Sequence, residues 1–488
     1  MAADYTKGLL RDYQNLILLL EKRSSEKKKL GLEINMLKNE VREQKEIISQ
    51  KDEKIEKLEL EVKRLKNNKS KDSTNSSIPT NKNSYTQVKN SRKKSDKKLG
   101  GQEGHEGFTL DVDKIQELIS SGRVDLEIIE INKCENNQNS PRIRYVQDIQ
   151  IRNIIKKYIY YPDESGNYKI PSSQNNLVTY GETIKSIGML LVHKLPASMD
   201  QVKYFFNIVT NNSVNLTKST IVNWTNTFAN SLEGLIEEIR EGLLNSQIVN
   251  TDESPINIDG KTYQLHNYSN KDFTLQYTNK KRTKEAIAEI DFLPKFFGTL
   301  IHDHNTVQYN YGSKHGECNA HILRYLQAVS DFTVHKWSEQ MIKFLQEVLH
   351  QRNLLTDSGE DSFDEITLKS YSDEYDKIIK SASKEYQTDY NKNAYKDDER
   401  RLITRLENYK QNHLLFMYDF NVPFTNNVAE SDIRPTKRKL NTGIFRSESG
   451  AESYLRIRSF ISTFQKRGLD IFDGILECFK KGNLTLTK

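Results

Sequence analysis

The sequence predicts a multidomain α/β protein with a coiled coil at its N-terminus, and three observations support this class. The chain has 488 residues, more than the roughly 250 residues at which single hydrophobic cores stop growing. A heptad repeat occupies its first part, and two apolar, strand-like segments later in the chain each end in an aspartate. No apolar run approaches the ~20 residues of a bilayer-spanning helix, and the first residues lack a signal-peptide core, so we expect a cytoplasmic protein.

The first expected element is a coiled coil over residues 1–66. Between Leu30 and Leu65, β-branched residues recur every seven positions, and leucine occupies most of the alternating positions. This combination favours a parallel two-stranded coil. The repeat therefore predicts a homodimer or larger assembly, with a single amphipathic helix folded back on its own protein as the alternative. The recurring β-branched residues are Ile34, Val41, Ile48, Ile55 and Val62.

Residues 67–110 are expected to form a basic, flexible linker. Residues 66–100 contain ten Lys or Arg and two Asp, a charge of +8, so the remainder of a chain of net charge +6 sums to −2. This stretch has almost no large aliphatic residues and cannot bury a core. Its cations, including Arg92, Lys93 and Lys94, would gain from counterion release on DNA, unless the segment is only a solvated linker. The motif GGQEGHEG at 100–107 allows tight turns but lacks the context of a phosphate loop.

Two small modules are expected next. Alternating segments such as VDLEIIEI predict a small β-rich module over residues 111–180, and three scattered cysteines in the whole chain argue against a bound zinc. Residues 181–245 predict a helical, helix-turn-helix-like module whose second helix begins after Thr217 as N-cap. If this module binds DNA, Ser219 and Asn223 are candidates for phosphate contacts, although many such helix pairs never touch DNA.

A ribonuclease H-like catalytic core is expected in two parts, residues 246–330 and residues 421–488. The first part reads as an apolar strand ending in Asp252, two further strands, a helix, and a strand ending in Asp303, which is the order of that fold's opening. A further helix is expected over residues 311–328. The charged segment 331–420 between the two parts is nearly free of glycine and predicts a helical insertion.

The second part of the core supplies a third acid. Asn426 or Asn427 is expected to cap a short helix that carries Glu430 and ends at Pro435. Glu430 is preferred to Asp432 because it lies in NNVAE. We treat the neighbouring acids of both parts as auxiliary groups; they are Glu253, Asp259, Asp419 and Asp432.

Three carboxylates in this order predict a two-metal-ion site. Asp252, Asp303 and Glu430 would hold two Mg²⁺ ions about 3.5–4 Å apart, one activating the attacking hydroxyl and one stabilising the leaving oxygen. Hard oxygen ligands suit Mg²⁺ better than the Cys or His nearby, with Mn²⁺ able to substitute.

Basic residues near these acids are candidates for DNA binding. His321 and Arg324 would hold a scissile phosphate, or else belong to a helix packed beneath the site. A second basic region begins in the last part of the chain and would contact the DNA backbone, with a solvated charge run as the alternative. Its candidate residues are Arg434, Lys437, Arg438 and Lys439.

Taken in order, these motifs resemble the insertion-sequence-sixty-six type of bacterial DDE transposase. The matching motifs are NSSIPT at 75–80, GGQEGHEG, TDES around Asp252, IHDH around Asp303, ECNAHILR at 317–324, NNVAESDIRPTKRK and FRSESG. Family members usually carry a cysteine-rich zinc module after the GGQ-type motif, whereas only Cys134 remains in residues 111–180 here.

The resemblance implies metal-dependent cleavage of double-stranded DNA at transposon ends and strand transfer into target DNA. The acidic triad would be Asp252, Asp303 and Glu430, in a nucleoid-associated bacterial protein with accessory proteins of the same element as candidate partners. Two alternatives remain: a catalytically inactive, DNA-binding transposase relic, and a structure-selective DNA nuclease using the same metal site.

Overall fold

The computed structural model describes residues 2–70, 110–131, 142–171, 174, 176–281, 283–388 and 395–486. They belong to two compact units, unit 1 with Met1–Ser84 and Asn319–Phe420 and unit 2 with Tyr85–Cys318 and Asn421–Lys488. Unit 1 is helical and unit 2 combines helices with one five-stranded sheet, so the chain is of the mixed α/β class. Within the described ranges, no helix combines the length and the apolar character needed to cross a membrane.

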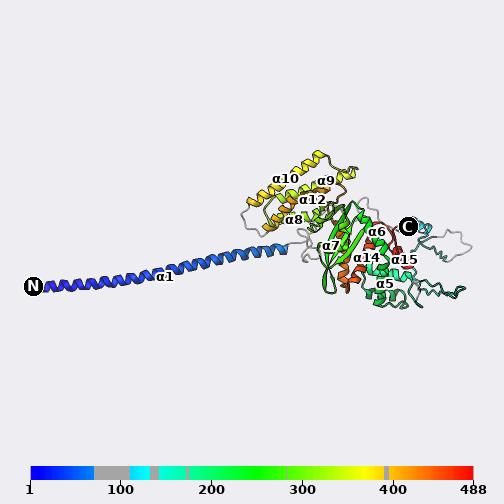
Figure 1. Ribbon diagram of the computed structural model, residues 1–488, viewed down its shortest axis with the longest axis horizontal. Coiled ribbons are helices and arrows are strands. Elements are labelled where there is room, and N and C mark those ends of the chain that lie inside the picture. The colour runs from blue at the N-terminus through cyan, green and yellow to red at the C-terminus, as the bar shows by residue number, and fades with distance from the viewer. Residues whose placement is uncertain are drawn as a thin grey trace. The chain divides into compact units, whose positions relative to one another are not determined.

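The N-terminal part of unit 1 is one continuous helix, α1 (Ala2–Ser70), drawn in blue in Figure 1. Its polar face carries ion pairs at helical spacing, such as Lys57 with Glu53 at 2.7 Å. The heptad residues from Leu30 to Val62 face solvent in the single chain: Val41 is 54% and Leu58 is 56% exposed. An apolar stripe therefore runs exposed along this helix.

The rest of unit 1 is built from helices that pack on one another. They are α8 (Asn319–Phe332), α9 (Trp337–Asp357), α10 (Glu365–Thr388), α11 (Lys396–Asn408) and α12 (Lys410–Tyr418). Their core includes the fully buried Trp337, whose indole Nε1 donates to the Glu399 carboxylate at 2.8 Å. The second segment of unit 1 begins at Asn319, before residue 331 where the sequence placed the insertion, because α8 packs against α9.

Unit 2 is organised around a sheet, drawn as arrows in Figure 1. Its strand order is β3-β2-β1-β4-β5. β1 and β2 pair antiparallel, as do β2 and β3, whereas β4 runs parallel to both β1 and β5. The β1–β2 hairpin turns at Asp259 and Gly260, both with positive φ, as a two-residue hairpin requires. The strands are β1 (Ile248–Ile258), β2 (Lys261–Ser269), β3 (Thr274–Asn279), β4 (Thr299–His302) and β5 (Lys314–Glu317).

Helices from both parts of unit 2 complete one hydrophobic core with this sheet. Phe228 of α5, for example, meets Phe460 of α14 with ring centroids 5.5 Å apart. The predicted helix pair is present as α4 and α5, with Thr217 capping α5, and its apolar face belongs to this shared core. The helical elements are α3 (Glu182–Met189), the π-helix η3 (Leu190–Lys194), α4 (Met199–Val209), α5 (Lys218–Ser231), α6 (Glu233–Leu244), α7 (Lys284–Ile290), η4 (Leu293–Lys295), η5 (Gln308–Asn310), α13 (Asn427–Thr442), α14 (Glu448–Lys466) and α15 (Ile471–Lys481).

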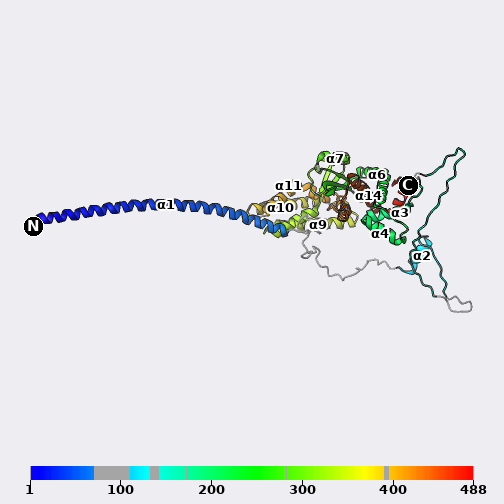
Figure 2. The ribbon, with the colours of Figure 1, turned by 90° about the horizontal axis from the view of Figure 1, so that it is seen from below.

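The prediction of a β-rich module over residues 111–180 is wrong for the residues that the structure describes there. Val112–Ser120 forms helix α2, because Asp111 caps it and Val112, Ile115, Leu118 and Ile119 recur at helical spacing. Residues 121–131 and 142–171 contain no strand, and their apolar side chains, such as Ile155 at 98%, are exposed. Figure 2 shows these residues running away from the helices of the unit as long loops. The alternation of apolar residues was present, but a strand also needs a pairing partner.

Two further expectations are corrected in the core. Residues 314–317 form strand β5 and not the start of a helix, because they complete the parallel edge beside β4. Pro435 does not end the helix that carries Glu430: α13 continues to Thr442 with the proline inside it. β1 also continues past Asp252, since its pairing with β2 extends to Ile258.

Candidate functional site

Two of the predicted acids lie side by side where the parallel part of the sheet ends. Asn250 of β1 is paired in register with Ile301 of β4, and this is the last pair between β1 and β4 in the described part of the chain. Asp252 and Asp303 each follow this pair by two residues. Side chains alternate between the two faces of a strand, so residues two apart lie on the same face. Both carboxylates therefore lie on the face of the sheet that carries Asn250 and Ile301.

Glu430 approaches the same place from α13, the helix that packs on β1 and β2. One donor atom each from Asp303, Glu430 and Cys318 lie within 4.8 Å of one another. Cys318 directly follows β5 and is fully buried. The chain thus brings together groups from β1, β4, the end of β5 and α13.

Asn426 joins these elements. Its side-chain amide Nδ2 donates to the Thr251 carbonyl at 2.9 Å and to Asp303 Oδ1 at 3.3 Å. Its Oδ1 accepts a hydrogen bond from Asn250 Nδ2 at 3.0 Å, and its backbone N–H donates to the Cys318 sulfur at 3.2 Å. The sequence suggested Asn426 only as a helix cap, but the side chain makes no capping bond to α13 and instead orients Asp303.

The electrostatic state of Asp252 reflects its burial and the negative charges beside it. Burial, followed by the neighbouring Asp303 carboxylate, raises the pKa of Asp252 to about 7, and Glu430 acts in the same direction. A hydrogen bond from the Glu253 N–H and the positive charge of Lys437 oppose this rise. Carboxylates arranged so that they repel one another without a cation are typical of sites that hold one.

The donor set fits a divalent cation. Glu430 Oε1 is buried and has no hydrogen-bond partner among the residues that the structure describes, while its Oε2 lies 3.7 Å from the exposed Arg434 guanidinium. A buried carboxylate oxygen needs a donor or a cation to offset its lost hydration. Carboxylate oxygens of Asp252, Asp303 and Glu430 are the hard ligands that Mg²⁺ and Mn²⁺ prefer.

The acids treated as auxiliary lie elsewhere or are already paired. Glu253 is buried beside His266, with 3.4 Å between the carboxylate and Nδ1, and Asp432 is held by α14 and β3. Asp259 lies in the exposed hairpin turn, and Asp419 follows α12 in unit 1. No pattern in the sequence indicates the contact between Glu253 and His266, because this contact depends on the register of β1 against β2.

The basic candidates of the last region all lie on α13. Arg434, Lys437 and Arg438 are exposed, whereas Lys439 is half-buried and burial lowers its pKa. The positive charge of Lys437 opposes the rise in the pKa of Asp252, and the Arg434 guanidinium lies 3.7 Å from Glu430 Oε2. The helix therefore offers cations next to the acidic cluster.

The remaining DNA-binding candidates are spread over other parts of the chain. Ser219 and Asn223 are exposed on α5 at a spacing of one helical turn. His321 and Arg324 belong to α8 of unit 1. Arg92, Lys93, Lys94 and Cys134 lie outside the described residues.

The fold and the site define an α/β protein with a partly buried carboxylate cluster suited to divalent cations. The Transposase IS66 family matches residues 204–453, which is 250 of the 488 residues and includes all three carboxylates. The chain therefore belongs to the Transposase IS66 family, and this membership gives it a transposase role with DNA as the substrate. No curated protein matches the chain.

Proposed function

We propose that the chain is a DDE transposase that cuts DNA at the ends of its element and joins those ends to target DNA. The observation that carries the proposal is the meeting of Asp252, Asp303 and Glu430, with the pKa of Asp252 raised to about 7. The strand order β3-β2-β1-β4-β5, with three antiparallel strands followed by two parallel ones, supports a ribonuclease H-like core.

Asp252, Asp303 and Glu430 would hold two Mg²⁺ ions, which when bound would activate an attacking hydroxyl and stabilise the leaving oxygen. The chain's own residues prepare this site. Asn426 holds the Asp303 carboxylate through its amide, and the buried ends of β1 and β4 exclude water from one side of the acids.

Cations on α13 and in the linker would bind the DNA backbone. Arg434 lies 3.7 Å from Glu430, and Lys437 and Arg438 are exposed further along α13, so a phosphate drawn to this helix would come close to the carboxylates. The linker over residues 67–110 would add a sequence-independent, salt-sensitive attraction, and Ser219 with Asn223 would add contacts from α5. This affinity for DNA would place the protein at the nucleoid.

The exposed stripe of α1 supports a coiled-coil dimer. A helix of 69 residues with valine and leucine about half exposed loses stability in water unless another helix covers the stripe. Two chains joined through α1 would bring two transposon ends together, with accessory proteins of the element as further candidates.

The test is a joining assay. Purified protein is incubated with a labelled DNA fragment carrying an end of its own element and with an unlabelled target plasmid, in Mg²⁺ or EDTA. Label covalently joined to the plasmid in Mg²⁺ alone supports the transposase. Cutting without joining would favour a nuclease, and binding without cutting, with accessory proteins supplied, would favour a DNA-binding relic.

A further inference from the structure

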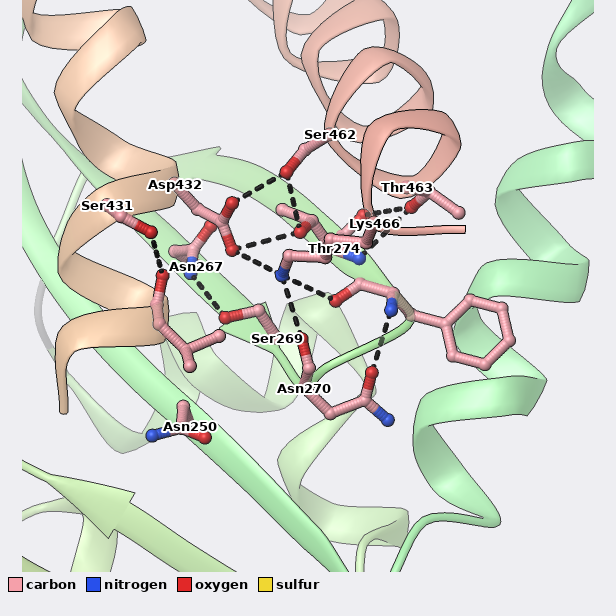
Figure 3. A network of polar contacts seen from close by, with 12 residues as sticks. Asn250, Asn267, Ser269, Asn270, Thr274, Ser431, Asp432, Ser462, Thr463 and Lys466 are labelled. Atoms are coloured by element: carbon pink, nitrogen blue, oxygen red, sulfur yellow. Dashed lines mark hydrogen bonds and ion pairs between the residues drawn. The ribbon is translucent and has the colours of Figure 1, made fainter. Parts of the chain in front are cut away.

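Asp432 lies two residues after Glu430, yet its side chain contacts a different part of unit 2. Residues i and i+2 of a helix point about 200° apart, so the two carboxylates leave α13 on nearly opposite sides. Figure 3 shows Asp432 directed at α14 and at the strand residue Thr274. Asp432 is 6% exposed, so this acid is buried inside unit 2.

Among the described residues, the groups that donate hydrogen bonds to the Asp432 carboxylate are two hydroxyls and one ammonium group. Oδ1 accepts from the Ser462 hydroxyl at 2.6 Å, and Oδ2 accepts from the Thr274 hydroxyl at 2.9 Å and from Lys466 Nζ at 2.7 Å. Lys466 itself donates to the carbonyls of Asn270 at 2.8 Å and Phe273 at 3.2 Å (Figure 3). The ion pair thereby ties α13, α14 and the β2–β3 turn to one another.

A second contact fixes α13 one turn further along. Gln276 of β3 donates from Nε2 to the backbone carbonyl of Asp432 at 3.0 Å and accepts at Oε1 from the Thr436 hydroxyl at 3.1 Å. Pro435 between them has no N–H, so the helix lacks one of its own backbone hydrogen bonds here. Side chains of the sheet therefore hold the helix where its own bonding is weakest.

We propose that Asp432 and Lys466 are positioning residues that set the rotation of α13 and so aim Glu430 at Asp303. This inference rests on the proposed function, because it assigns Glu430 to the metal site. A rotation of α13 by a fraction of a turn moves the Glu430 carboxylate by more than an ångström, and Mg²⁺ tolerates little departure from octahedral geometry. Residues outside the ligand set typically change metal affinity by about 10- to 100-fold.

The test measures metal binding, which does not require activity. Mn²⁺ is titrated into full-length wild type and into Asp432→Asn by calorimetry, and thermal unfolding is recorded for both. We expect Asp432→Asn to bind Mn²⁺ about tenfold more weakly. The double variant Asp432→Asn/Lys466→Met removes both charges and leaves no buried unpaired one, so its Tm should recover while its Mn²⁺ affinity stays low.

A matched control is Glu399→Gln in unit 1. Glu399 is also a buried carboxylate, 1% exposed and bonded to His335 and Trp337, so this change should lower Tm and leave Mn²⁺ affinity unchanged. Wild-type affinity in Asp432→Asn, or affinity that recovers with Tm in the double variant, would overturn the positioning role. Mn²⁺ binding by wild type without DNA cleavage would refute only the proposed function, whereas no Mn²⁺ binding would refute both.

Discussion

Replacing Asp252 by asparagine should stabilise the metal-free protein while abolishing its activity. The native structure raises the pKa of Asp252 from 3.8 to about 7, so the folded protein holds a proton that the unfolded chain has already released. The contribution of the neutral Asp252 carboxyl to the free energy of unfolding is complete below about pH 4 and is lost as the pH rises through about 7. Asparagine is neutral at every pH and can still accept the hydrogen bond from the Glu253 N–H.

The size of the effect follows from the pKa difference. A difference of about three units at 1.36 kcal/mol each gives an upper value of about 4 kcal/mol. Asp252 is only partly buried, so solvent screening reduces this, and we expect about 1–2 kcal/mol at pH 8. For a unit of this size such a gain raises Tm by roughly 2–6 °C.

The assay is thermal unfolding in EDTA at pH 5 and pH 8, followed by circular dichroism. Asp252→Asn should unfold at a higher temperature than wild type, by a larger margin at pH 8 than at pH 5. Glu452→Gln, an exposed carboxylate on α14, is the control and should show little change at either pH. A Tm for Asp252→Asn equal to or below that of wild type at pH 8 would show that the ionised Asp252 carboxylate does not destabilise the fold.

Three further predictions concern the acids, the coiled coil and DNA binding. Asp303→Asn and Glu430→Gln should each lower the rate of DNA cleavage at least about 100-fold, which raises the activation free energy by about 3 kcal/mol. Both variants should keep their DNA affinity in gel shifts, and a parallel loss of DNA binding would argue against a catalytic role. Val41→Asp places a charge in the apolar stripe and should convert the dimer to monomer in light scattering, whereas an unchanged mass would contradict the coiled coil. Lys437→Ala should weaken DNA binding and reduce the salt slope by about 1, and an unaltered slope would place Lys437 off the DNA.

The parts predicted well from sequence are those determined by local pattern. The order of strands and helix from Ile248 to His302 follows from apolar runs, turn residues and the Thr283 cap, all of which act over a few positions. Asp252 and Asp303 were proposed as ligands because each follows a run of apolar residues, and their role stays a prediction. The helix α1 was predicted from its heptad repeat, a pattern that can be read without any tertiary contact.

The parts that failed depend on contacts distant in sequence. Strand β5 has only four residues, including Gly316, and exists because β4 offers it a parallel partner. Pro435 is tolerated within α13 because Gln276 and the Asp432 ion pair hold the helix around it. Asn426 looked like a cap, and only the meeting of β1, β4 and α13 reveals that it orients Asp303.

Metal-dependent DNA cleavage is the role proposed for Asp252, Asp303 and Glu430. Its most direct test is single-turnover cutting of DNA containing the element's own ends, in Mg²⁺ and in EDTA, by wild type and by Asp252→Asn. We expect cuts at the ends by wild type in Mg²⁺ only, and none by Asp252→Asn, although the variant binds the same DNA. Equal cutting by Asp252→Asn, or cutting by wild type in EDTA, would contradict it.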